Sequence, residues 1–102
     1  MRIDAHQHFW HLDKPFCDWP TPAEGRIYAD FDESDLAPLL NACGVDGTVL
    51  IQAAPSLDET HFLLEIADRA PFVRGVVGWI DMDAPSAMSD IEALACHPRF
   101  RG

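Results

Sequence analysis

Long apolar runs are absent from this 102-residue chain, although 48% of its residues are hydrophobic. No run approaches the ~18 consecutive apolar residues that a transmembrane helix needs. The N-terminus also has no basic region followed by an uninterrupted apolar core, which excludes a typical secretory signal. We therefore expect a cytoplasmic, globular chain that is long enough for one small domain with one core.

Cysteine is scarce, and its spacing suits neither metal binding nor disulfide bonding. Cys17, Cys43 and Cys96 are odd in number and far apart, and none belongs to a Cys-x-x-Cys pair. This pattern argues against a thiolate zinc site and a disulfide scaffold, and it fits a reducing cytosol. We expect Cys43 and Cys96 to be small buried apolar residues.

Basic residues are few, with seven Lys and Arg against seventeen Asp and Glu and a net charge of −10. Nucleic acids and anionic membranes are therefore not expected partners, because both are bound through Lys and Arg. Several catalytic motifs are also missing: there is no Gly-x-Ser-x-Gly elbow, no phosphate-binding glycine loop and no His-Glu-x-x-His.

Strand-like and helix-like segments alternate along the chain. Strands are predicted over residues 2–8, 47–52 and 73–80, and helices over 34–43, from a capping box at Ser56–Glu59 to Ala70, and over about 85–96. The expected core-facing residues are Leu36, Leu39, Leu40 and Cys43 in the first helix, Leu63, Ile66, Ala67 and Ala70 in the second, and Met88, Ile91, Leu94 and Ala95 in the third.

This βαβαβα order predicts an α/β fold with a parallel sheet and right-handed crossovers. Three strands cannot close a barrel, so the chain is either a small open domain or the first part of something larger. The end of the sequence just past a helix breaker, Pro98, favours a fragment.

His6 and His8 lie at the carboxyl end of the first predicted strand. Residues i and i+2 of a strand share one face, with Cα atoms roughly 6.6 Å apart. Two imidazoles at this spacing can converge on one divalent ion, most plausibly zinc, at about 2.0–2.1 Å. Asp4 has the same parity and is expected to orient or assist them. The alternative is that both histidines are ordinary polar surface.

Further candidates follow the later strands. Gln52 ends the second strand and is a candidate for binding a substrate oxygen, Trp79 near the end of the third for lining a pocket, and Tyr28 in the long aromatic loop 11–31 for covering a substrate. Catalytic zinc usually has three protein ligands. The remaining candidates for a third are His11, His61, Asp81, Asp83 and His97. Each has a structural interpretation: His61 as an exposed helical residue, His97 at a helix C-terminus, and Asp81 as a cap or solvated group.

Three segments resemble the amidohydrolase 2 branch of the amidohydrolase superfamily. They are Ile3–Trp10, which contains the histidine pair, Gly44–Ala53 and Gly75–Asp81, and they match its first three strands in order. The likeness is strongest to the barrel hydrolases of sugar lactones, a group that includes L-fuconolactonase and L-rhamnonolactonase. It implies that residues 1–102 form an incomplete N-terminal part of a (β/α)8 TIM barrel.

The resemblance also implies an activity. A lactonase of this kind hydrolyses a carboxylic ester in carbohydrate catabolism. His6 and His8 would be its catalytic and metal-binding pair, although related lactonases work without a metal. The general base is expected beyond residue 102, so the chain alone is expected to be inactive. Alternatives are a non-catalytic fragment that self-associates, or a relative with decarboxylase or other metal-dependent hydrolase chemistry.

Overall fold

The computed structural model describes all residues from 1 to 102. The strands are β1 (Ile3–Gln7), β2 (Gly47–Ile51) and β3 (Val73–Val77), and the helices are α1 (Glu33–Cys43), α2 (Leu57–Arg69) and α3 (Ala87–Ala95), with a short 3-10 segment, η1 (Pro22–Ile27). The sheet order is β1-β2-β3, and both pairings are parallel. The predicted α/β order of elements is confirmed. No helix here combines the length and apolar character needed to cross a membrane.

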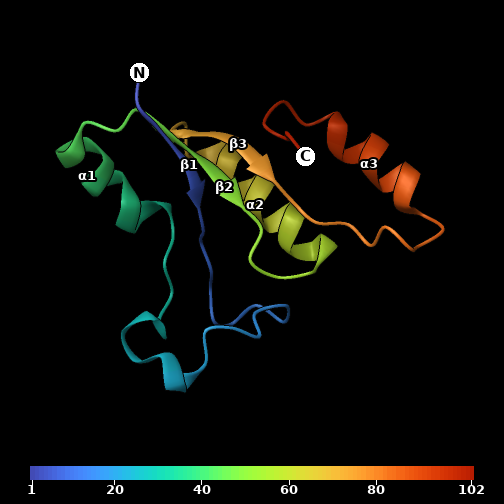
Figure 1. The fold of residues 1–102 in the computed structure, drawn as a ribbon, viewed down its shortest axis with the longest axis horizontal. Helices are drawn as coiled ribbons and strands as arrows, with labels where there is room; N and C mark the ends of the chain where they lie inside the picture. Colours follow the sequence, from blue (N-terminus) through green and yellow to red (C-terminus); the bar gives the residue numbers. More distant parts are fainter.

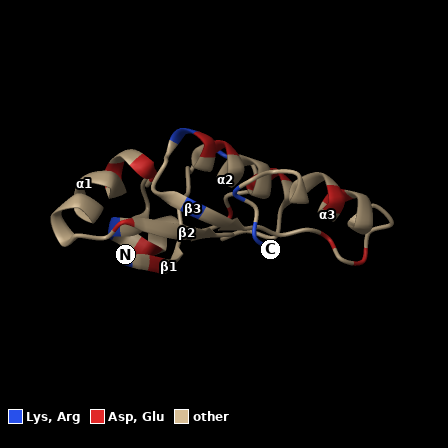
Figure 2. Ribbon diagram, turned by 90° about the horizontal axis from the view of Figure 1, so that it is seen from above, with Lys and Arg blue, Asp and Glu red and all other residues tan.

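The three helices lie on one side of the sheet, and α2 packs directly behind it (Figures 1 and 2). The acidic residues are spread over the helices and loops rather than gathered in one place (Figure 2). Beyond α3 the chain returns to the edge of β3. There the N–H of Val76 donates to the carbonyl of Arg99 and the N–H of Arg101 to the carbonyl of Val76, each at 2.8 Å, in a parallel bridge. Residues 99–102 thus occupy the position of a fourth parallel strand.

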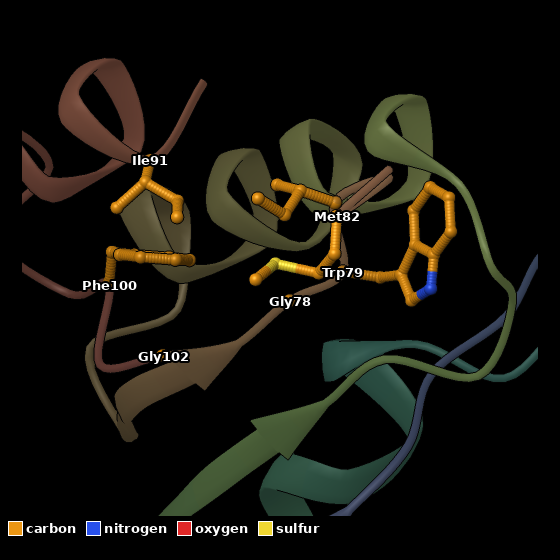
Figure 3. A pocket seen from close by; sticks show the side chains of 7 residues that line it. Gly78, Trp79, Met82, Ile91, Phe100 and Gly102 are labelled. Atoms are coloured by element: carbon orange, nitrogen blue, oxygen red, sulfur yellow. The ribbon is translucent and has the colours of Figure 1, made fainter. Parts of the chain in front are cut away.

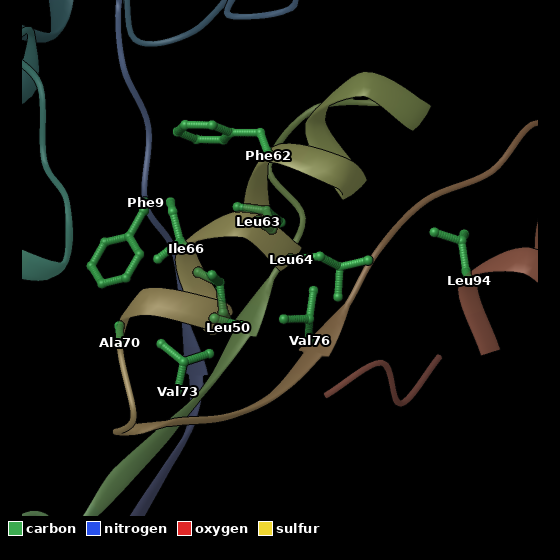
Figure 4. Packing of buried hydrophobic residues seen from close by; sticks show 11 residues of the cluster. Phe9, Leu50, Phe62, Leu63, Leu64, Ile66, Ala70, Val73, Val76 and Leu94 are labelled. Carbon is green, nitrogen blue, oxygen red and sulfur yellow. The ribbon is translucent and has the colours of Figure 1, made fainter. Parts of the chain in front are cut away.

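The core forms where α2 packs on β2 and β3 (Figure 4). Leu50 of β2 and Val76 of β3 are fully buried, as are the residues that α2 presents to them. The predicted stripe of α2 is confirmed, since its members are all at most 3% exposed: Leu63, Ile66, Ala67 and Ala70. Arg69 ends the helix before Pro71, as the sequence indicates.

The predicted inner faces of α1 and α3 are partly wrong. Leu39 is 61% exposed and Met88 is 69% exposed, while Leu40 and Leu94 are buried. Cys43, Ala95 and Cys96 are also exposed. These two helices flank the sheet rather than lying across it (Figure 1). Each therefore buries only the edge of its apolar stripe, and no element of the chain covers the rest.

The third strand is shorter than predicted because, at Trp79, hydrogen bonds to a side chain of α2 take the place of hydrogen bonds to a neighbouring strand. The hydroxyl of Thr60 donates to the carbonyl of Trp79 and accepts from the N–H of Trp79, both at 2.8 Å. Thr60 is fully buried, and a Cβ added at Gly78 would overlap its methyl group. Only glycine allows this close approach, so β3 ends at Val77.

Thr60→Val is expected to destabilise the protein by about 1–3 kcal/mol, because both backbone groups of Trp79 lose their partner while the side-chain volume stays the same. The free energy of unfolding, measured by urea denaturation, checks this. Thr60→Ser keeps the hydroxyl and serves as the control. Equal stability of the valine variant and the wild type would contradict the role assigned to the hydroxyl.

Candidate functional site

The two histidines predicted from the first strand meet at the carboxyl ends of β1 and β2. The Nε2 atoms of His6 and His8 are 3.1 Å apart, and their ring centroids are 4.9 Å apart with the ring planes at 73°. His6 is exposed, whereas His8 is half-buried just beyond the strand. Gln7 lies between them and is buried on the opposite face, where the hydroxyl of Thr48 donates to its Oε1 at 3.2 Å.

A backbone carbonyl of the neighbouring strand orients His8. Its Nδ1 lies 2.9 Å from the carbonyl oxygen of Ile51, so Nδ1 carries a proton and donates it. In the neutral ring this leaves the lone pair on Nε2, which faces His6. The same arrangement, one ring nitrogen donating and the other free, is typical of histidines that bind metals.

The histidine pair fits two of the ligands of a divalent ion. Two nitrogens on one tetrahedral zinc are roughly 3.3 Å apart when each lies 2.0–2.1 Å from the ion. The observed 3.1 Å separation is close to this value. No group of three or more His, Cys, Asp or Glu side chains forms a ligand cluster among residues 1–102. The chain therefore supplies two ligands, where catalytic zinc usually has three.

The other predicted ligands lie apart from the pair. Asp4 accepts a hydrogen bond from the backbone N–H of His6 at 3.1 Å and makes no hydrogen bond to either imidazole ring. The register between β1 and β2 shifts between Asp4 and Gln7, which breaks the strict alternation that the sequence predicts. His11 pairs with Asp32 and His97 with Asp68, each at 3.0 Å. The carboxylate of Asp81 accepts from the N–H of Asp83 in a local turn, as its structural interpretation requires.

The predicted substrate-binding residues lie in three different places. Gln52 follows β2 and is half-buried, and its backbone N–H donates to the carbonyl of Val77 at 2.8 Å. Tyr28 is 44% exposed at the end of η1. Trp79 lines a cavity on the far side of β3. Only Gln52 adjoins the histidines, through the Ile51 carbonyl that His8 contacts, and the substrate-binding roles of all three residues stay predictions.

The cavity beside Trp79 has a volume of about 380 Å³. Its walls come from the end of β3, from α3 and from residues 100–102, and include Met82, Ile91 and Phe100 (Figure 3). None of its lining side chains is an acid, a base or a metal ligand. The lining of this cavity therefore supplies no group for acid–base or metal-assisted catalysis.

A second cavity, of about 220 Å³, lies beyond the carboxyl ends of β1 and β2, with Trp10 and Ala53 in its lining, and contains one residue that sequence reasoning missed. Glu59 lines it and is only 3% exposed, and its Oε1 accepts a 2.6 Å hydrogen bond from the N–H of Ala53. Burial raises the pKa of the Glu59 carboxyl, although hydrogen bonds from the N–H groups of Ala53 and Ala54 and the nearby His8 oppose this shift. The one signal for Glu59 in the sequence was its place in the predicted capping box, Ser56–Glu59. Ser56 does cap α2, but Glu59 turns away to hold the loop after β2.

The long loop after β1 also contributes residues to the lining of this cavity. Its ring contacts with Phe62 of α2 come from His11 at 5.4 Å and Phe16 at 5.8 Å, between centroids. Trp19 lies further along the loop, 5.7 Å from the ring of Trp10, and both line the cavity. Part of the loop thus packs on α2, while part borders the site.

Comparisons with known proteins agree with this architecture. A family model described as Amidohydrolase matches residues 3–102. An L-fucono-1,5-lactonase from Burkholderia ambifaria is 46% identical over all 102 residues of the chain, and one from Burkholderia multivorans is 38% identical over 85 residues. The chain spans only about a third of their length, 35% of the first and 29% of the second.

Solved structures show the same relation. An amidohydrolase from Burkholderia multivorans with bound HEPES superimposes on the whole chain with a TM-score of 0.88 at 33% identity, and one with bound Zn does so with a TM-score of 0.86 at 34% identity. The chain covers 35% and 36% of these two structures. The fold is therefore the N-terminal βαβαβα portion of a TIM barrel. With a family match over nearly its whole length, the chain belongs to the amidohydrolase family.

Proposed function

We propose that residues 1–102 are the N-terminal part of a barrel domain that hydrolyses the ester bond of a sugar lactone. The observation that carries this proposal is the histidine pair, whose Nε2 atoms converge at 3.1 Å at the carboxyl ends of the strands. Active sites of (β/α)8 barrels lie at that end of the strands. The 46% identity to a protein named L-fucono-1,5-lactonase supports a lactone as the substrate.

The chemistry that lactone opening needs is consistent with this pair. The ester carbonyl has to be polarised and a water molecule has to be placed for attack. The hydrogen bond from His8 Nδ1 to the carbonyl of Ile51 holds the His8 ring in place. In this orientation the Nε2 atom of His8 faces the Nε2 atom of His6. A divalent ion held by His6 and His8, when bound, supplies Lewis-acid polarisation and a more acidic water. Zinc is our first choice of ion, and a relative has been solved with bound Zn.

The rest of the machinery is proposed to come from outside these residues. The pair lacks a third ligand, and no further histidine or carboxylate joins it within the chain. We place the missing ligands and the general base after later strands of the barrel. His6 and His8 are thus catalytic and metal-binding residues of an incomplete site.

The remaining expectations concern location and partners. We propose a cytoplasmic enzyme of carbohydrate catabolism that acts on a small molecule and binds neither nucleic acid nor membrane. The three free thiols and the net charge of −10 support this assignment.

The proposal is tested with aldonolactones and a full-length barrel containing this chain. The barrel is either its own or the Burkholderia ambifaria lactonase with the matched segment exchanged for residues 1–102. We expect hydrolysis by the full-length form and none by the 102-residue chain alone, measured by release of acid from the lactone. Robust turnover by the chain alone, or none by the barrel, would contradict the proposal.

Self-association of the 102-residue chain is the alternative, and the exposed Leu39, Met82 and Met88 favour it. The mass of the chain in size-exclusion chromatography separates the two cases. A cooperative monomer would count against a self-associating fragment.

A further inference from the structure

The cavity of about 220 Å³ follows the carboxyl ends of β1 and β2, the end of the sheet where the histidine pair lies. Trp10, in its lining, follows His8 by two residues, and Ala53, also in the lining, follows Ile51 by two. Two residues of extended chain span roughly 6.6 Å. Because His8 donates to the carbonyl of Ile51, both segments start from this one contact. The cavity therefore lies on the same rim of the sheet as the pair, two residues beyond His8 on one side and two beyond Ile51 on the other.

The aromatic walls of the cavity are held in place before any ligand arrives. The indole N–H of Trp10 donates to the carbonyl of Ala29 at 2.9 Å, and its ring packs on Phe31 at 5.3 Å. A backbone bridge between Trp10 and Phe31 adds a second attachment. The ring of Trp19 packs against that of Trp10, with 5.7 Å between centroids, but Trp19 is 49% exposed. The result is a preformed aromatic surface with one accessible ring.

The polar part of the cavity accepts hydrogen bonds rather than binding anions. Its two ionisable oxygen groups are the carboxylates of Glu59 and Asp18, and no Lys or Arg lines it. Glu59 is nine-tenths buried and is fixed by the N–H of Ala53 at 2.6 Å. A phosphate or a carboxylate would be repelled here, whereas a hydroxyl group would find a strong acceptor.

We propose that this cavity is the subsite for the hydroxylated ring of the substrate, with Trp19 stacking on the C–H face of the ring and Glu59 accepting from a ring hydroxyl. The inference rests on the proposed lactone hydrolysis and adds which lactones the enzyme would select. The lactone carbonyl then points toward His6 and His8, while the hydroxyl-bearing side of the ring enters the cavity. A neutral, polyhydroxylated six-membered ring has an apolar C–H face that can stack on Trp19 and hydroxyl groups that can donate to Glu59.

The test compares two lactones in the full-length enzyme. L-Fucono-1,5-lactone carries ring hydroxyls, whereas δ-valerolactone has the same ring size without them. The ratio of their kcat/KM values measures recognition of the hydroxylated ring, because the ester chemistry is common to both. We expect Trp19→Ala to lower this ratio about 3- to 10-fold, mainly through a higher KM for the hydroxylated lactone. Glu59→Gln should lower the ratio about tenfold or more, because a charged acceptor for a hydroxyl is lost.

The variants are chosen so that misfolding cannot imitate the result. Trp19 is half-exposed, and glutamine at position 59 keeps an oxygen for the N–H of Ala53. Leu39→Ala, an exposed apolar residue of α1 outside the cavity, is the matched control and should keep the wild-type ratio. Unchanged ratios in both variants, or equal losses on both lactones, would overturn the subsite alone. Hydrolysis of neither lactone by the wild type would overturn the proposed function and the subsite with it.

Discussion

Replacing His6 and His8 together by alanine is expected to lower kcat/KM of the full-length enzyme for lactones by at least about 10³-fold. The physical reason is the loss of both Nε2 nitrogens, which lie 3.1 Å apart and which the proposed function places at the reacting carbonyl. Residues that act as one unit lose most of their effect with the first removal, so each single variant should already approach the loss of the double variant. Steady-state kinetics with an aldonolactone measures all three.

The fold is expected to survive the double substitution, because His6 is exposed and the side chain of His8 makes one hydrogen bond outside the pair, to the carbonyl of Ile51. Circular dichroism and the midpoint of urea unfolding check this. His61→Ala is the matched control, since His61 is exposed on α2 and lies outside the ligand pair. Metal content measured by elemental analysis should fall in the double variant if the pair binds an ion. Unaltered turnover would show that His6 and His8 are not part of the active site.

Local patterns predicted the histidine pair well, because strand alternation alone puts His6 and His8 on one face. What completes the geometry is not local. The proton on His8 Nδ1 is assigned by the carbonyl of Ile51, 43 residues away in sequence. The register shift between Asp4 and Gln7 similarly depends on how β1 pairs with β2. Neither can be read from the periodicity of a single strand.

Helix faces show the same limit. Periodicity correctly predicted the buried stripe of α2, whereas the predicted faces of α1 and α3 are buried only in part. Leu39 and Met88 share a face with buried neighbours and yet remain exposed. Glu59 is the converse case. Its position in a capping box predicted a local role, whereas the path of the loop after β2 brings it to the N–H of Ala53 and into the cavity.

Phe62 joins the core to the long loop, and Phe62→Ala is expected to destabilise the protein by about 3–5 kcal/mol. The ring is 8% exposed and belongs to the buried cluster of α2 (Figure 4). On its outer side it contacts the rings of His11 and Phe16, and the ammonium group of Lys14 lies 5.2 Å from its centroid. Truncation therefore leaves a cavity in the core and removes the surface on which the loop rests. Urea denaturation measures the loss.

Phe62→Leu separates these two effects. Leucine keeps most of the buried volume, so the cost in stability should stay below about 1.5 kcal/mol. It has no ring face for His11, Phe16 or Lys14, so the loop that carries Trp19 loses its aromatic support. If the loop forms one wall of the ring subsite, KM for a hydroxylated lactone should rise while kcat changes little, because His6 and His8 lie on β1 and at its end, outside the loop. A stable Phe62→Leu enzyme with wild-type KM would show that the loop is positioned without Phe62. If Phe62→Ala lowers the free energy of unfolding by less than about 1 kcal/mol, Phe62 does not contribute to holding α2 against the core.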